Sequence, residues 1–131
     1  MMESEKIKKA VVTIKIIGVG GGGNSVIARI ADGNELDVEL IAVNTDAKQI
    51  AHMDEVGIQA IAIGRELTKG LGTGGVADIG EAAAKGDADK IKYAMRGADL
   101  VFVTASMGGG AGTGAAPVVA KLAKDMGILT V

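Results

Sequence analysis

The sequence predicts an α/β fold, a doubly wound parallel sheet of the Rossmann type with strand order 3-2-1-4-5. Short β-branched segments alternate along the chain with Ala-rich segments of helical periodicity, which is typical of a parallel sheet covered on both faces. Glycine accounts for 21 of the 131 residues, against a usual share of about 7%, and it is concentrated in three clusters. Because 48% of the residues are apolar but only 2% are aromatic, the core must be built from aliphatic side chains.

The first half of the chain predicts two strands and two helices. Residues 11–19, VVTIKIIGV, are β-branched and nearly continuous, which indicates a strand buried on both faces. After a glycine run, NSVIARIADGN predicts a helix that ends near Gly33. Residues 38–44, VELIAVN, predict the second strand, and a short helix follows over about 47–53.

The middle of the chain predicts a third strand and two more helices. The strand is IQAIAIG, residues 58–64, and a long glycine-bearing loop follows it. Helical segments are expected over about 78–86 and 88–96. Asp87 is placed to cap the second of these, and Gly97 stands where a glycine commonly ends a helix.

The last third of the chain predicts a strand, a glycine loop, a helix and the start of a fifth strand. The strand is DLVFVTA, residues 99–105, and the run MGGGAGTGAAP follows it. We expect Pro117 in the first turn of the next helix, where its missing N–H costs nothing, and Gly127 at that helix's end. Residues 128–131, ILTV, begin the fifth strand, so we expect a sheet that is incomplete and open at this C-terminal edge.

Two of the glycine clusters meet in the predicted topology. In the order 3-2-1-4-5 the winding reverses between strands 1 and 4, and ligands bind at this point beyond the carboxyl ends of the strands. The glycine runs at 18–24 and 108–114 follow these two strands. Glycine-rich loops that lead into helix N-termini bind phosphate groups through backbone N–H groups. The sequence therefore predicts a phosphate-binding crevice between two glycine loops, to which the cluster at 70–75 could add a third wall.

Composition excludes several function classes. The net charge of −2 offers no basic surface for nucleic acid, and without cysteine there is no disulfide or thiolate chemistry. No signal peptide or apolar run of membrane-spanning length is present, so we expect a cytoplasmic protein without direct membrane insertion. The P-loop pattern G-x-x-x-x-G-K-[ST] is absent. No cluster of metal-ligating or nucleophilic residues stands out.

The first glycine run leaves a dinucleotide-binding module open as an alternative. GVGGGG, residues 18–23, satisfies G-x-G-x-x-G after a strand, and the acid expected some 20 residues later is present as Asp46. This pattern would make the chain an NAD(P)-binding Rossmann module of an oxidoreductase. It does not explain the second, longer glycine loop after strand 4.

Five ordered segments resemble the tubulin/FtsZ family, and within it the prokaryotic cell-division branch. The segments are IKIIGVGGGGNS, IAVNTDA, LTKGLGTGG, ADLVFVTASMGGG and GGGAGTGAAPVVAKLAKDMGILTV. The last contains a variant of the family's GGGTGTG signature. The resemblance runs from about residue 14 to residue 131, and it identifies residues 1–131 as the N-terminal part of a GTP-binding domain.

The resemblance implies GTP or GDP and Mg²⁺ as ligands, and it assigns residues to them. Residues 20–25 correspond to a first phosphate-binding loop, residues 44–46 to a second loop, and residues 72–75 to a third loop that senses the γ-phosphate. Mg²⁺ is expected to be held through the phosphates with Asp46 nearby, although Asp46 is also interpretable as a ribose ligand or a plain turn residue. The nucleotide-binding residues are expected to be Gly20, Gly21, Gly22, Gly23, Asn24, Ser25, Asp46, Thr73, Gly74, Gly109, Gly110, Ala111, Gly112 and Thr113.

The chain departs from the family pattern at three places. Ala111 replaces the usual threonine of the signature, which removes one hydroxyl. Thr73 stands where alanine is usual, and Val-Ala-Asp at 76–78 replaces Asn-Pro-Glu. Because backbone N–H groups should carry most of the phosphate binding, we expect GTP binding to survive the first change with a loss of about 0.5–1.5 kcal/mol.

The resemblance also bears on assembly and catalysis. Family members polymerise head to tail, and an acidic loop in their C-terminal part reaches the nucleotide of the next subunit to support GTP hydrolysis. We expect that second domain to be absent here, so no catalytic residue is assigned and hydrolysis by this chain alone is not expected. The implied setting is septum formation at the division site, with other division proteins as partners. A truncated, non-catalytic filament partner is an alternative.

Overall fold

The computed structural model describes residues 12–33 and 37–131, and within them it confirms the predicted fold class. The five strands are all parallel and lie in the order β3-β2-β1-β4-β5. Val11 of the expected first strand and Asn34 of the expected first helix lie outside the described residues. The strands are β1 (Ile14–Val19), β2 (Glu39–Asn44), β3 (Gln59–Ala62), β4 (Leu100–Ala105) and β5 (Leu129–Thr130).

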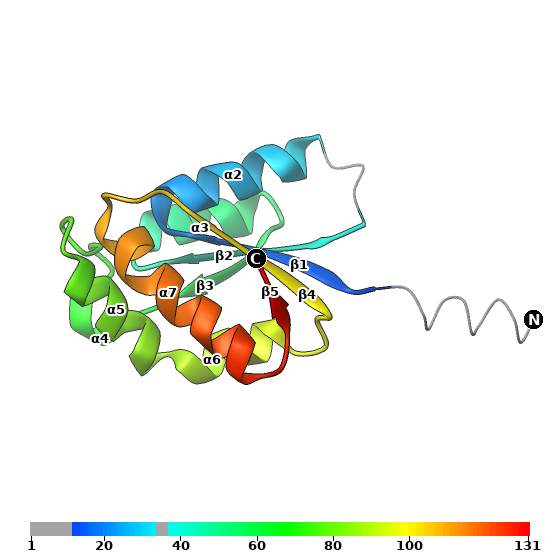
Figure 1. Ribbon diagram of the computed structural model, residues 1–131. Coiled ribbons are helices and arrows are strands. Elements are labelled where there is room, and N and C mark those ends of the chain that lie inside the picture. Colours follow the sequence, from blue (N-terminus) through cyan, green and yellow to red (C-terminus); the bar gives the residue numbers. More distant parts are fainter. Residues whose placement is uncertain (1–11, 34–36) are drawn as a thin grey trace, which may run out of the picture.

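Helices cover both faces of the sheet (Figure 1). The helices are α2 (Gly20–Asp32), α3 (Ala47–Glu55), α4 (Arg65–Thr68), α5 (Ala77–Gly86), α6 (Ala88–Met95) and α7 (Gly110–Asp125). Helices α2 and α3 lie on one face, and α5, α6 and α7 lie on the other. None of the helices in the described parts of the chain is long and apolar enough to cross a bilayer.

The central strand β1 contributes to a separate apolar core on each face. Ile17 and Val19 belong to the larger core, whereas Ile16 packs against the smaller core that contains Ile27 and Met53. Ile17, Val19 and Ile27 are almost completely buried. This two-sided burial explains the near-continuous apolar sequence of the strand, as expected for a sheet with helices on both faces.

Two helices begin earlier than the sequence predicts. Helix α2 starts at Gly20, so the glycine run forms its first turn, and α7 starts at Gly110. The expectation that Pro117 lies in the first turn of α7 was therefore wrong, because Pro117 is inside the helix. Low intrinsic helix propensity is overridden here by packing: a Cβ on Gly110 would overlap the side chain of Thr73. Only a residue without a side chain permits that approach.

The segment between β3 and α5 also differs from the sequence expectation. It contains the short helix α4, where a continuous loop was expected. Asp87 occupies the N-cap position of α6 but makes no capping hydrogen bond there. Its Oδ2 instead accepts the backbone N–H of Gly64 at 2.7 Å, which ties the end of β3 to the junction of α5 and α6. Gly97 follows α6 with φ = 81°, as expected for a glycine that ends a helix.

Lys15 joins β1 to the C-terminal end of α6. Its Nζ donates to the backbone carbonyls of Ala94 and Arg96 at 2.9 and 2.8 Å, and it lies 3.0 Å from a carboxylate oxygen of Glu39. Lys15 is buried, whereas the Glu39 side chain is more than half exposed. The two carbonyls, rather than the ion pair, are the groups that depend on this lysine.

We expect Lys15→Met to lower the free energy of unfolding by about 2–3 kcal/mol, since it leaves two carbonyls without a charged donor. Glu39→Gln is the matched comparison, and it should cost less than about 1 kcal/mol because exposed ion pairs contribute little. Urea denaturation of both variants measures the difference. Equal losses would show that the ion pair carries the effect.

Candidate functional site

A cavity of about 320 Å³ lies where the carboxyl ends of β1, β2 and β4 meet. It is called the loop cavity below. It has residues from all three glycine clusters in its walls. Its lining consists of Val19, Gly20, Gly21, Gly22, Asn44, Thr45, Asp46, Gln49, Leu71, Gly72, Thr73, Gly74, Ser106, Gly109, Gly110, Ala111 and Gly112.

The N-termini of two long helices open into this cavity. Helix α2 begins at Gly20 and α7 at Gly110, and neither has a side chain that caps its first turn. The first N–H groups of a helix lack intrahelical partners, and they carry the positive end of the helix dipole. Two uncapped N-termini in one cavity therefore form a strong site for an anion.

The two N-termini approach each other at backbone distance. A Cβ on Gly20 would lie 2.8 Å from the backbone nitrogen of Gly112, and Gly20 also has φ = 75°. A Cβ on Gly22 would overlap the side chain of Ser106. Side chains at these positions would push the helices apart, so the glycines are required to bring both sets of N–H groups to one ligand.

Asp46 of the second loop caps the N-terminus of α3 with its carboxylate. Asp46 Oδ1 accepts the backbone N–H groups of Lys48 and Gln49 at 2.9 and 3.2 Å. This cap uses the donors of α3 that an anion would otherwise reach. Asp46 therefore brings a negative charge to the loop cavity, beside the two uncapped helices.

Three amide side chains, two of them buried and the third exposed, connect the first loop to the second. Asn24 Nδ2 donates to the carbonyls of Gly18 and Val43, at 2.9 and 3.3 Å. Asn44 Nδ2 donates to Asn24 Oδ1 at 3.0 Å and to Gln49 Oε1 at 2.9 Å. These three amides, Asn24, Asn44 and Gln49, are called the amide chain below, and they fix the ends of β1 and β2 relative to α3.

The segment that carries the third loop is held against the second loop and against the N-terminus of α7. Its backbone pairs with the second loop through the Asp46–Leu71 bridge and through the Ala47 N–H, which donates to the Gly70 carbonyl at 3.0 Å. Thr73 is buried and its hydroxyl lies against Gly110 at the start of α7. A ligand that displaces this loop must therefore also act on the N-terminus of α7.

The charge distribution of the cavity limits what it can hold. Asp46 is its sole charged lining residue, and no Lys, Arg or His lines it within the described parts of the chain. The same residues contain no group of three or more acidic, His or Cys side chains that could hold a metal by themselves. A polyanion bound here would therefore be held by backbone N–H groups, and a divalent cation shared between the anion and Asp46 would neutralise the remaining charge.

The structure brings ten of the fourteen expected binding residues to the loop cavity. Those outside its lining are Gly23, Asn24, Ser25 and Thr113. Asn24 is 2% exposed and belongs to the amide chain, and the Thr113 hydroxyl accepts the Gly108 N–H at 2.8 Å. These two side chains hold the loops that form the cavity.

Four lining residues were not expected from the sequence, namely Val19, Gln49, Leu71 and Ser106. Two of them had a usable signal. Gln49 follows Asp46 by three residues, which is the spacing of a helix capping box, and Ser106 directly follows the predicted strand at 99–105.

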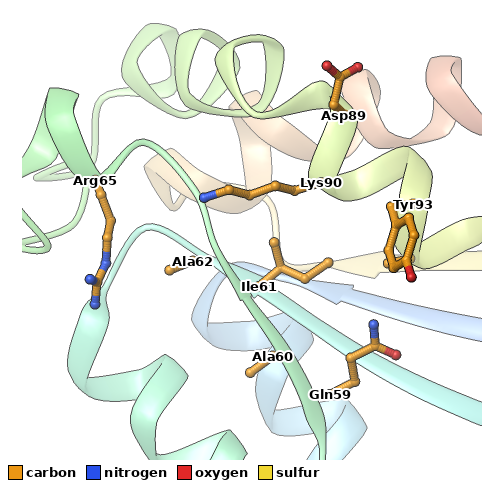
Figure 2. A pocket seen from close by; sticks show the side chains of 9 residues that line it. Gln59, Ala60, Ile61, Ala62, Arg65, Asp89, Lys90 and Tyr93 are labelled. Carbon is orange, nitrogen blue, oxygen red and sulfur yellow. The ribbon is translucent and has the colours of Figure 1, made fainter.

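A larger cavity of about 660 Å³ lies along the outer edge of β3 (Figure 2). Figure 2 shows Lys90 and Tyr93 of α6 on one side of it and Gln59 to Ala62 of β3 on the other. Lys90 is paired with Asp87 at 3.6 Å. The first turns of α4 and α6 reach its lining at Arg65, Asp89 and Lys90, but among the described residues this lining includes no glycine, so it lacks the glycine-lined helix N-termini of the loop cavity.

Comparisons with known proteins agree with the geometry. The family described as Tubulin/FtsZ family, GTPase domain, matches residues 13–131. The empty FtsZ dimer of M. jannaschii is 41% identical with a TM-score of 0.89, over 97% of this chain and 36% of that one. The GTPγS-bound protofilament of CetZ2 from Haloferax volcanii is 29% identical with a TM-score of 0.76, over 91% and 38%.

A more distant structure shares the fold. TubZ of the Clostridium botulinum phage c-st is 23% identical with a TM-score of 0.62, over 88% of this chain and 35% of that one. The chain thus spans little more than a third of each of these proteins.

Proposed function

We propose that this chain, which belongs to the tubulin/FtsZ family of GTPase domains, binds GTP and GDP. Their phosphates would lie in the loop cavity. The observation that carries this proposal is the meeting of two uncapped helix N-termini, those of α2 and α7, in one glycine-lined cavity. Six glycines at these two N-termini line the loop cavity. They are Gly20, Gly21, Gly22, Gly109, Gly110 and Gly112.

Mg²⁺ is part of the proposed complex. The residues present fit it, because Asp46 supplies a hard carboxylate oxygen beside the phosphates while no basic side chain lines the cavity within the described residues. Asp46 Oδ1 is used to cap α3, which leaves Oδ2 to approach the cation directly or through water. When bound, Mg²⁺ would neutralise phosphate charge, and Asp46 would orient it.

Calorimetric titration of the chain with GTP tests the proposal. We expect saturable binding that GDP displaces, that NADH does not displace, and that EDTA weakens. Competition by NADH would favour the dinucleotide-binding alternative. No binding at millimolar GTP with Mg²⁺ would contradict the proposal outright.

We further propose a role in a head-to-tail filament of prokaryotic cell division, in the cytoplasm and at the division site. The CetZ2 protofilament supports the assembly part of this proposal, since a relative assembles with a nucleotide analogue bound. In such a filament this chain would supply the nucleotide face. Asp46 is the one acidic side chain that lines the cavity in the described residues, so activation of water for hydrolysis is assigned to the adjoining subunit.

The filament proposal is tested by adding the chain at substoichiometric amounts to a full-length polymerising relative. Shorter filaments, seen by electron microscopy, would show that the nucleotide face docks on a subunit end, as a non-catalytic capping partner also would. Incorporation without shortening would indicate a subunit that can be extended. No effect on length or mass would contradict the filament role.

Restoring the missing signature hydroxyl should have a modest effect. Ala111 lines the loop cavity and is 8% exposed, at the second position of α7. We expect Ala111→Thr to strengthen GTP binding by about 0.5–1.5 kcal/mol, the contribution of one hydrogen bond. Calorimetry measures the gain. An increase of a hundredfold would show that side-chain hydroxyls, rather than backbone N–H groups, dominate the binding.

A further inference from the structure

We propose that Gln49 is the side chain of the loop cavity that donates a hydrogen bond to the phosphates, and that the amide chain fixes its direction. This inference rests on the proposed nucleotide binding. Gln49 is the third residue of α3, in its first turn, and it lines the loop cavity. It also lines an adjoining cavity of about 530 Å³, so its side chain stands at the boundary between the two.

The direction of each amide follows from backbone groups at the two ends of the amide chain. At one end the Asp46 N–H, which can only donate, lies 3.1 Å from Asn44, so Asn44 must present its oxygen there. At the other end the carbonyls of Gly18 and Val43 can only accept, so Asn24 must present its nitrogen. Amide oxygen and nitrogen are thereby distinguished by chemistry alone.

The direction of the Gln49 amide follows from that of Asn44. With its oxygen used by Asp46, Asn44 turns its NH₂ group toward Asn24 and Gln49. Gln49 must accept this hydrogen bond through Oε1, which lies 2.9 Å from Asn44 Nδ2. Its Nε2 then has no hydrogen-bond partner among the described residues, and both of its N–H groups are free for a ligand.

The position of Gln49 suits a phosphate oxygen. A Cβ on Gly21 would lie 3.2 Å from Gln49 Oε1 and 3.6 Å from Nε2, so the amide lies directly over the first turn of α2. That turn offers backbone N–H groups to the same anion. Asn44 is the other member of the amide chain that lines the cavity, and both of its N–H groups already donate to Asn24 and Gln49. Gln49 is therefore the neutral side chain, already oriented by Asn44, whose N–H groups can donate to a phosphate in the loop cavity.

Two substitutions at Gln49 separate donation from structural support. Gln49→Glu keeps an oxygen that can accept from Asn44, but it replaces the free NH₂ group with a negative charge. Gln49→Met removes donor and acceptor without adding charge. Gln59→Glu is the matched control, since it makes the same chemical change at an exposed residue in β3, outside the loop cavity.

Calorimetric titration with GTP, and with inorganic triphosphate as a second probe, is done at saturating Mg²⁺. We expect affinity losses of about tenfold for Gln49→Met and of about a hundredfold for Gln49→Glu, the range for hydrogen bonds to charged groups. Both probes should show the same factors, because the contact is to phosphate. Gln59→Glu should bind within about twofold of the parent chain, and the melting temperature of Gln49→Glu should stay close to that of the parent.

Each other result overturns a defined part of the proposal. Unchanged affinity in both Gln49 variants would overturn the donor role and leave nucleotide binding intact. A loss in Gln49→Glu alone would show charge repulsion without a hydrogen bond, and would also overturn it. A parent chain that binds neither probe would overturn the proposed nucleotide binding, and the role of Gln49 with it.

Discussion

Replacing Gly114 with alanine is expected to lower the free energy of unfolding by about 3 kcal/mol or more, at the upper end of overpacking effects. Gly114 lies where α7 crosses α5. A Cβ there would overlap the carbonyl oxygen of Ala77 and would lie 2.6 Å from the backbone nitrogen of Glu81. Both obstacles are backbone atoms, which cannot rotate away as a side-chain end could. The helices must separate, and the packing of Ala115 and Val119 in the larger core is lost with them.

The same substitution should also weaken nucleotide binding. Helix α5 begins at Ala77, directly after the third loop, and Gly80 contacts the backbone of Gly110 at the start of α7. A shift of α5 therefore moves Thr73 and Gly74 away from the cavity they line. Thermal unfolding measures the stability, with a fall of roughly 10 °C or more expected for a domain of this size. Calorimetry with GTP measures the loss of binding.

Gly86→Ala is the control for the chemical change itself. Gly86 ends α5, and a Cβ at this position would meet nothing within 4 Å. Alanine favours a helix over glycine by up to about 1 kcal/mol, so this variant should be as stable as the parent chain or more so. If Gly114→Ala behaved like Gly86→Ala, the close crossing of α5 and α7 would be contradicted.

The sequence predicted the elements whose signal is local and continuous. Strand β1 is apolar on both faces because helices cover both faces, and each of the five expected strands is present in the predicted order. The switch point between β1 and β4 followed from that order. The two glycine loops that lie beside it could therefore be predicted to share one crevice.

What the sequence could not supply is the reason for individual glycines and amides. Gly20 and Gly110 are read as loop residues by propensity, yet they begin α2 and α7. Glycine is needed at both positions because backbone atoms of distant segments lie where a side chain would be. For Asn24, the sequence did not predict that its side chain donates to carbonyls near the ends of β1 and β2. Such contacts join residues that are distant in sequence, and no local pattern encodes them.

The second large effect on stability is expected for Asn24→Asp. Asn24 is 2% exposed, and its Nδ2 donates to the Gly18 and Val43 carbonyls. An aspartate would place a carboxylate oxygen against these two acceptors, both of them backbone carbonyls. An uncompensated buried charge typically costs 3–5 kcal/mol, so we expect a loss of about that size at neutral pH.

The pH dependence of this variant identifies the cause. Burial raises the pKa of a carboxyl group, so the introduced aspartate would bind a proton more readily in the folded state than in the unfolded state. The folded variant therefore takes up more protons, and its stability relative to the parent chain falls as pH rises through that raised pKa. Below the ordinary aspartate pKa of about 3.9 the deficit should be smallest, because the protonated carboxyl can donate one hydrogen bond.

Urea denaturation at several pH values, with Gln59→Glu as the exposed amide-to-acid control, measures this dependence. Gln59→Glu should track the parent chain at every pH, because an exposed carboxyl keeps its hydration in both states. A pH-independent loss in Asn24→Asp would point to altered packing instead of a buried charge. If Asn24→Asp kept full stability and lost only GTP affinity, Asn24 would contact the nucleotide directly, and the amide chain would not be what holds the first loop against the second.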